Sequence, residues 1–164
     1  MLSKKMAKEL NDQVTFELES AYIYLAMAAW AEVENLKGAG SFFRIQAKEE
    51  ISHGMKFFEY LLERGAEVSL GAVAQPKCSY PNLRAALEAA LKHEKFISGR
   101  CHKLMEIAQA EKDYATAAML NWFVTEQVEE ESNFETILAR LAIAGDKGTA
   151  LLIIDKELGK RTDD

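Results

Sequence analysis

Residues 43–61 read FRIQAKEEISHGMKFFEYL, an apolar stripe that two metal-binding side chains interrupt. Residues on one helix face recur at alternating steps of three and four. The face counted in this way consists of Phe43, Ala47, Glu50, His53, Phe57 and Leu61. An otherwise apolar helix face therefore carries a glutamate and a histidine, one turn apart, near its midpoint.

Three other stretches repeat this pattern. Their stripes run from Leu10 to Ala28, from Leu83 to Ala108 and from Leu120 to Ala144. The polar residues at their midpoints are Glu17 in the first, Glu94 in the second, and Gln127 and Glu130 in the third. Four amphipathic helices, each with a carboxylate in its apolar face, are typical of a four-helix bundle with a polar layer inside.

The buried carboxylates need a counter-charge. A carboxylate that leaves water loses hydration worth several kcal/mol even after relaxation. Four of them together would cost more than the roughly 5–15 kcal/mol that stabilises a typical domain. Because the stripes contain no Lys or Arg beside these glutamates, bound cations are the best candidates to offset the charge. The pattern therefore predicts a dinuclear metal site inside the bundle.

Length, composition and charge fit this prediction. The chain has 164 residues, 49% hydrophobic and 28% charged, which predicts one domain over residues 1–164 that can bury a core. The longest apolar run, residues 21–31, is too short to cross a bilayer. No signal-peptide core follows Met1, so we expect a cytoplasmic protein without a membrane partner. The net charge of -6 argues against nucleic acid as a partner.

Turn and cap signals divide the chain into five expected helices. They cover residues of about 3–35, 41–64, 82–111, 113–144 and 149–158, with a connection over about 65–80. The run Lys37-Gly38-Ala39-Gly40 is expected to break the first helix from the second. Short connections make the first two helices and the third and fourth helices antiparallel hairpins.

The longer connection selects the topology. The second helix is roughly 39 Å long at 1.5 Å per residue, and about 12 extended residues would retrace it. A connection of residues 65–80 can therefore travel the whole bundle, which makes the second and third helices parallel. The expected fold is all-α: a four-helix bundle with one long crossover and a short fifth helix.

Counting from the turns tests whether the polar residues share a layer. Glu94, Gln127 and Glu130 all lie roughly 23–27 Å from the turn near residue 112. In the other hairpin, Glu17 lies about 18 residues before its turn and Glu50 only 10 to 12 after it, a mismatch of one to two turns that an overhanging first helix or a loop off the bundle end could absorb. This mismatch is a mild discrepancy in the predicted layer.

These residues, in this order, resemble a known family. Glu17, Glu50-x-x-His53, Glu94 and the segment from Trp122 to Glu130 are similar to the non-haem ferritins of bacteria and archaea, over essentially the whole chain. The closing segment, residues 151–158, also resembles that family. The resemblance implies a ferritin-like bundle with ferroxidase activity. Such a protein oxidises Fe(II) with O2 or H2O2 and stores hydrous ferric oxide in a hollow homo-oligomeric cage, generally of 24 subunits.

The resemblance also implies roles for individual residues. One iron ion would be bound by Glu17, Glu50 and His53. A second ion would be bound by Glu50, Glu94 and Glu130, with Glu50 bridging the pair. Gln127 would lie beside the two ions, and Tyr24 would be a neighbouring partner and electron donor. A third iron site would draw on Glu49, Glu126, Glu129 and Glu130.

Haem is not expected. Ile51 stands where haem-binding relatives carry a methionine after the bridging glutamate. The chain also lacks the cysteine-rich iron domain of rubrerythrin-like peroxidases. The apolar run of residues 150–154 would be exposed on an isolated bundle, which suggests burial against other subunits.

Other interpretations stay open at this point. A di-iron or di-manganese carboxylate oxidase or peroxidase without mineral storage would need the same ligands, and a third alternative is a structural bundle without metal. Glu49, Glu126 and Glu129 also fit a solvated acidic helix face. Tyr24 also fits an ordinary core tyrosine, and Gln127 a hydrogen-bonded core amide.

Overall fold

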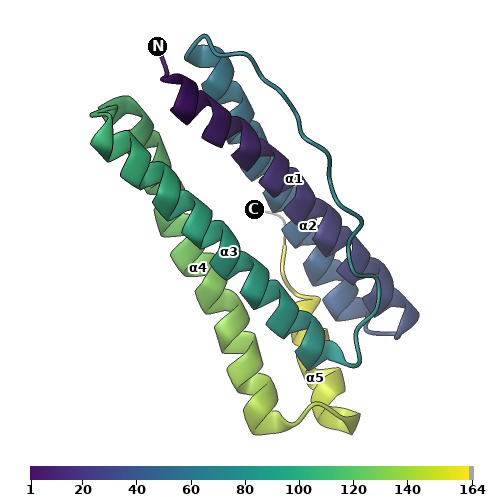
Figure 1. Cartoon of the computed structure of the whole chain (residues 1–164). Coiled ribbons are helices and arrows are strands. Elements are labelled where there is room, and N and C mark those ends of the chain that lie inside the picture. Colours follow the sequence, from purple (N-terminus) through teal and green to yellow (C-terminus); the bar gives the residue numbers. More distant parts are fainter. Residues whose placement is uncertain (163–164) are drawn as a thin grey trace.

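The computed structural model describes residues 1–162 and shows five α-helices and no strand in this part of the chain (Figure 1). The helices are α1 (Lys4–Val33), α2 (Lys37–Glu63), α3 (Leu83–Ala110), α4 (Tyr114–Ala144) and α5 (Gly148–Leu158). The all-α class expected from the four apolar stripes is therefore confirmed.

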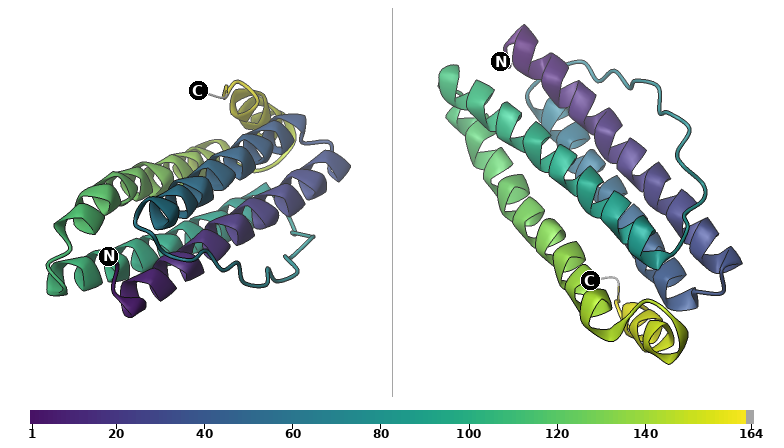
Figure 2. Two further views of the ribbon diagram at one scale, coloured as in Figure 1. Left: turned by 90° about the horizontal axis from the view of Figure 1, so that it is seen from above. Right: turned by 60° about the horizontal axis from the view of Figure 1, so that its bottom comes forward.

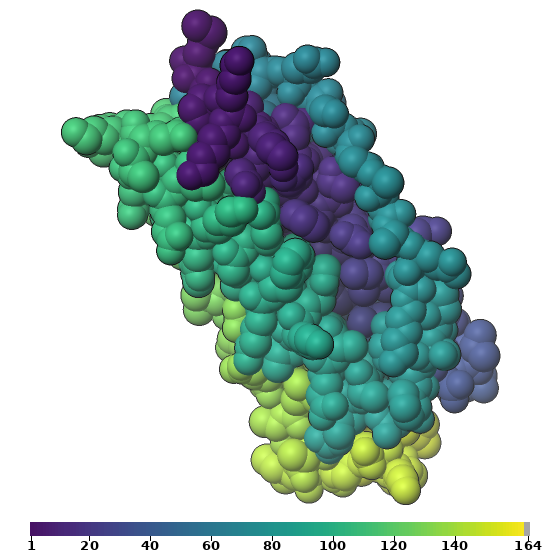
Figure 3. Space-filling view, in the orientation of Figure 1, coloured from purple at the N-terminus to yellow at the C-terminus, as the bar shows by residue number. Residues whose placement is uncertain are grey.

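The first four helices form the bundle, and α5 lies at one end of it (Figure 2). Helices α1 and α2 form one antiparallel hairpin, and α3 and α4 form the other. The connection after α2 runs back along the outside of α1, so α2 and α3 are parallel, as the length of this segment predicts (Figures 1 and 3). Two α1 side chains hold the connection: Asn11 bonds to Glu67 and Ser69, and Thr15 to Gly71. No helix in the described part of the chain is long and apolar enough to cross a membrane.

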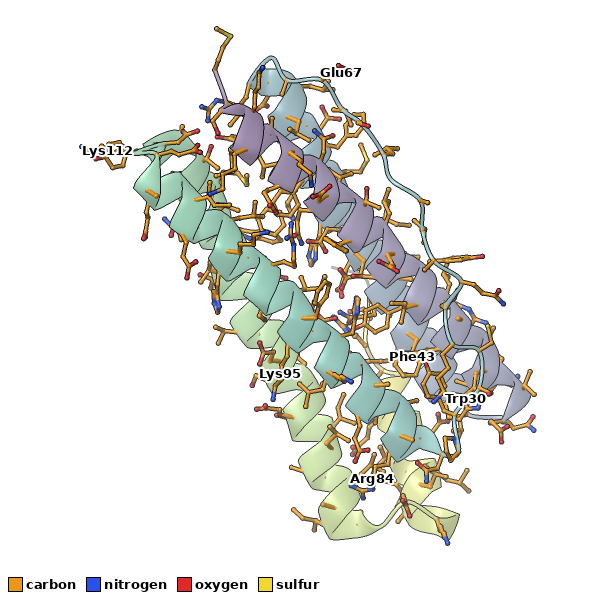
Figure 4. The ribbon with its side chains drawn as sticks, viewed as in Figure 1. Trp30, Phe43, Glu67, Arg84, Lys95 and Lys112 are labelled. Atoms are coloured by element: carbon orange, nitrogen blue, oxygen red, sulfur yellow. The ribbon has the colours of Figure 1, made fainter. Side chains whose placement is uncertain are left out.

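The hydrophobic core consists of two clusters, one in each half of the bundle. One contains Tyr24, Phe43 and Phe134, and the other contains Phe57 and Phe123. Along each of the four long helices, the predicted polar residues fall between the two clusters. Figure 4 shows the side chains that fill this interior, with Phe43 pointing into it. The fold thus places one polar layer between two apolar regions.

Helix α2 begins at Lys37, four residues before the expected start near residue 41. The chain turns at Asn35, whose φ of 60° lies in the left-handed region that asparagine tolerates better than most residues. Gly38 and Gly40 therefore belong to the first turns of α2 and do not break the helix. Counted from Asn35, Glu17 is 18 residues before the turn and Glu50 is 15 after it. The remaining difference is less than one helical turn, so the earlier start removes most of the mismatch in height.

The early start of α2 depends on α5. A helix leaves its first backbone N–H groups without partners inside the helix. The carboxylate of Asp155 in α5 accepts hydrogen bonds from the N–H of Gly38 at 3.1 Å and of Ala39 at 2.8 Å. The same contact explains Gly38, because a Cβ there would lie 1.7 Å from the Asp155 carbonyl oxygen.

We expect Gly38→Ala to lower the free energy of unfolding by about 3 kcal/mol or more, because the new methyl group displaces α5 and its cap on α2. Gly99→Ala in α3 is the matched control. A Cβ at Gly99 meets no described atom within 4 Å, so this change should stabilise by roughly 0.5–1 kcal/mol. Thermal unfolding of both variants measures the difference. Equal melting temperatures would contradict the docking of α5 on α2.

Candidate metal centre

Six residues singled out from the sequence lie together in the polar layer, and none has more than 4% of its surface exposed. They come from all four long helices. The six are Glu17, Glu50, His53, Glu94, Gln127 and Glu130. Four carboxylates in so small a buried volume require positive charge or protons.

One half of the layer brings together Glu17, Glu50 and His53. One potential ligand atom from each lies within 4.8 Å of the others. The imidazole Nδ1 of His53 is 3.6 Å from Oε2 of Glu50. Oε2 of Glu17 and Oε1 of Glu50 are buried and accept no hydrogen bond from an N–H or hydroxyl group of the described residues, although the Glu17 carboxyl can share a proton with Glu50 when it is protonated. Because buried acceptors are nearly always satisfied, these two oxygens fit ligands of a cation.

The other half is formed by Glu94 and Glu130 with their partners. The Tyr24 hydroxyl donates a hydrogen bond to Oε1 of Glu94, and Gln127 Nε2 donates to Oε2 of Glu94 at 3.1 Å. Tyr24 itself is fully buried and stacks between Phe43 and Phe134. Tyr24 and Gln127 thus touch the carboxylate layer directly.

The electrostatics of the layer favour protons or cations. Burial, and then the charge of Glu50, raises the pKa of Glu17 to about 8. Burial and the charges of Glu94 and Glu130 raise the pKa of Glu50 well above its ordinary value. Burial and the charge of Glu94 raise the pKa of Glu130 to about 7. The pKa of Glu94 is also raised, mainly by burial. A bound divalent cation would lower these pKa values and release protons.

The residues suggested for a third site are only partly brought together. Glu126 and Glu130 offer ligand atoms within 4.8 Å of one another and of His53. Glu49 is partly buried and pairs with a cation, as described below. Glu129 is exposed and belongs to neither group of potential ligands found in residues 1–162. A site that uses all four carboxylates would need these side chains to move.

Two glutamines in the layer were not expected from the sequence. Gln13 Nε2 donates to Oε1 of Glu17 at 2.7 Å, and Gln46 Nε2 donates to Oε2 of Glu130 at 2.7 Å. Both glutamines are fully buried. Each precedes a buried glutamate, Glu17 or Glu50, by four residues, a spacing that puts two side chains on one helix face. That spacing is a signal that could have identified them.

Arg161 was not expected at the site either. Its guanidinium donates from Nη1 to Oε1 of Gln46 at 2.5 Å and from Nη2 to Oε2 of Glu49 at 2.6 Å. The four stripes indeed lack Lys and Arg, but this cation enters from the segment that follows α5. Periodicity within a helix carries no signal for such a contact.

The comparisons with known proteins agree with this geometry. A family model described as a ferritin-like domain matches residues 7–144. The chain is 44% identical to a bacterial non-heme ferritin of Staphylococcus aureus (strain USA300), over 100% of this chain and 99% of the relative. It is 40% identical to the bacterial non-heme ferritin of Staphylococcus haemolyticus, with the same coverage. The crystal structure of an open pore ferritin from the archaeon Archaeoglobus fulgidus superposes with a TM-score of 0.97 at 42% identity, over 99% of this chain and 100% of the other.

Proposed function

The chain belongs to the ferritin family of iron-storage proteins, and we propose that its buried carboxylate layer is a ferroxidase centre that oxidises Fe(II) before storage. The observation that carries the proposal is the pair of buried, unpartnered carboxylate oxygens on Glu17 and Glu50, within ligand distance of His53. Fe(II) and the oxidant are substrates in this scheme. Oxygen and imidazole ligands suit iron in both oxidation states.

We assign one Fe(II) to Glu17, Glu50 and His53 and a second to Glu50, Glu94 and Glu130. Glu50 is the proposed bridge because it interacts with residues of both halves of the layer. Its charge raises the pKa of Glu17, and the charges of Glu94 and Glu130 raise the pKa of Glu50. Two Fe(II) ions together supply the two electrons that convert O2 and two protons to H2O2, or H2O2 and two protons to water. The proposed outer position uses Glu49, Glu126, Glu129 and Glu130.

Hydrogen bonds from neighbouring side chains would orient the ligands. Gln13 holds one oxygen of Glu17, and this leaves the other oxygen for a cation. Tyr24 and Gln127 orient Glu94 from two sides. The glutamates that hold protons in the metal-free protein would release them as Fe(II) binds. A role of Tyr24 as electron donor stays a prediction.

The alternative is a di-iron or di-manganese oxidase or peroxidase without mineral storage. Full-length similarity to ferritins favours storage, and so does the apolar surface at the α4–α5 end. Ile143, Leu152 and Ile153 are 88%, 62% and 56% exposed in the single chain. Large exposed apolar side chains near one another are typical of an interface. We propose that residues 1–164 act as one domain that assembles into a closed homo-oligomer of about 24 subunits, the number that the family resemblance implies. Cytoplasmic residence stays a prediction.

Iron loading tests the storage proposal. Several hundred Fe(II) ions per assembly are added to the metal-free protein in air, and size-exclusion chromatography follows protein and iron together. We expect iron to elute with a large particle at far more than about three ions per subunit, because mineral grows beyond the binding sites. The same iron added without protein controls for free ferric precipitate. Uptake that stops at about two or three ions per subunit on a small species would contradict storage and leave the alternative.

A further inference from the structure

Arg100 in α3 reaches across to α1 and contacts the glutamine that holds Glu17. Its Nε donates a hydrogen bond to Oε1 of Gln13 at 3.3 Å, and Nε2 of Gln13 donates to Oε1 of Glu17 at 2.7 Å. Gln13 is fully buried. Arginine, glutamine and glutamate therefore form one chain of hydrogen bonds that ends on a proposed iron ligand.

Arg100 is itself held in place by other residues of α1. Its Nη2 lies 2.9 Å from Oε2 of Glu9 and donates to the backbone carbonyl of Glu9 at 3.3 Å. The guanidinium also lies over the ring of Phe16, and only 12% of the Arg100 side chain is exposed. A planar guanidinium with an ion pair, a carbonyl partner and an aromatic face is held in one orientation. Its Nε is therefore a fixed donor beside Gln13.

The two neighbours of Gln13 fit only one orientation of its amide. A guanidinium can only donate hydrogen bonds, and a carboxylate that binds a metal ion can only accept them. Arg100 accordingly faces the amide oxygen, and Glu17 faces the amide nitrogen. A half-turn of the amide would point its N–H groups at the guanidinium and its oxygen at the carboxylate, so both hydrogen bonds would be lost. Arg100 thus prevents the amide of Gln13 from turning over.

The other glutamine of the layer that was not expected from the sequence has the same arrangement. Oε1 of Gln46 accepts from Arg161, and Nε2 of Gln46 donates to Glu130 at 2.7 Å. Each of these two buried glutamines has an arginine at its oxygen and a proposed iron ligand at its nitrogen. The two ligands belong to different ions in the proposed centre, so Arg100 would act on the first ion only.

We propose that Arg100 is a positioning residue for the first metal position: by fixing the amide of Gln13, it keeps Oε1 of Glu17 occupied and leaves Oε2 for the metal ion. Oε2 of Glu17 is the oxygen that accepts no N–H or hydroxyl group of the described residues. Without Arg100 the amide can turn over, and its oxygen then repels the deprotonated carboxylate that a cation requires. This inference rests on the proposed function, because it needs a metal ion at Glu17.

The test measures Zn²⁺, which binds without redox chemistry, by calorimetric titration of the metal-free assembled protein. In Arg100→Met we expect the affinity for one ion of the inner pair to fall about tenfold, the effect of one hydrogen bond to a charged group, and the affinity for the other to change less than about twofold. The sign is decisive, because the loss of a positive charge alone would tighten the binding of a cation.

Lys103→Gln is the matched control. Lys103 lies one turn after Arg100 on α3 and also pairs with Glu9, at 2.8 Å, so its removal takes away a positive charge but leaves the contact between Arg100 and Gln13 in place. This variant should bind both Zn²⁺ ions as tightly as the wild type or slightly more tightly.

A double-mutant cycle shows whether Arg100 acts through Gln13. Gln13→Leu removes the amide, so we expect the same loss of about tenfold for the same ion, and Arg100→Met should cause no further loss in that background. A structural role of Arg100 that is independent of Gln13 would give the same additional loss in both backgrounds. If Arg100→Met does not assemble, Arg100→Gln takes its place in the cycle.

Fe(II) oxidation gives a second readout. The Fe(II) concentration that gives half the maximal rate should rise about tenfold in Arg100→Met with little change in kcat, because the metal ligands themselves remain. Unchanged or tighter Zn²⁺ binding, equal weakening of both ions, or additive losses in the cycle would overturn the inference alone. A wild type that binds no pair of Zn²⁺ ions would overturn the proposed centre itself, so the two failures are distinguishable.

Discussion

Glu50→Ala is expected to slow Fe(II) oxidation by at least about 100-fold, because the proposed bridging ligand serves both ions. Glu50 lies between the two halves of the layer. Its Oε1 has no hydrogen-bond partner and Glu50 forms a group of potential ligands with Glu17 and His53, while the charges of Glu94 and Glu130 raise its pKa. Its loss removes a ligand from each ion and the link that keeps them adjacent. Stopped-flow absorbance and oxygen consumption after anaerobic Fe(II) loading measure the rate.

Glu59→Ala is the matched control, since Glu59 is an exposed glutamate of the same helix. It should oxidise Fe(II) at the wild-type rate. The isosteric change Glu50→Gln adds a second comparison, because it keeps the volume but cannot carry the charge that raises the pKa of Glu17. We expect it to stabilise the metal-free protein at about pH 8 by roughly 1–3 kcal/mol. Wild-type oxidation by Glu50→Ala, together with lower stability of Glu50→Gln, would mean that Glu50 is only structural.

Features that depend on the residues of a single helix could be predicted from the sequence. Glu17, Glu50 and Glu94 are buried because alternating steps of three and four place them on apolar faces. The same reasoning separates Glu130, which is buried, from Glu129, which is exposed one position away. The order of the helices and the single crossover followed from the lengths of the connections.

The features that could not be predicted depend on contacts between distant parts of the chain. The start of α2 is set by Asp155, which is 117 positions from Gly38. Arg161 reaches Glu49 across 112 positions. Helix periodicity predicts which face is buried, but not which residue of another helix contacts that face. Bound cations are therefore not the only candidates for the counter-charge, because a guanidinium supplies part of the positive charge at the edge of the centre.

The metal-free protein is expected to lose stability as pH rises from about 4.5 to about 8. The folded-state pKa of Glu17 is raised to about 8 and that of Glu130 to about 7, against ordinary values near 4.5. In this window the folded protein holds more protons than the unfolded chain, so the free energy of unfolding falls with pH. A tenfold difference in proton affinity between the folded and unfolded states corresponds to about 1.4 kcal/mol. The free energy of unfolding should therefore fall by on the order of 3–5 kcal/mol from the fully buried Glu17 alone.

Saturating Zn²⁺ should reverse the sign of this dependence, because a cation binds the deprotonated carboxylates and competes with protons. Chemical unfolding at several pH values, with and without Zn²⁺, measures both slopes. Glu17→Gln should flatten the metal-free slope, since it removes the carboxyl group whose pKa is raised to about 8, whereas Glu19→Gln on the same helix should leave it unchanged. A metal-free slope that rises with pH would mean that the carboxylates are already compensated within the protein. The need for a bound cation, on which the proposed ferroxidase centre depends, would then disappear.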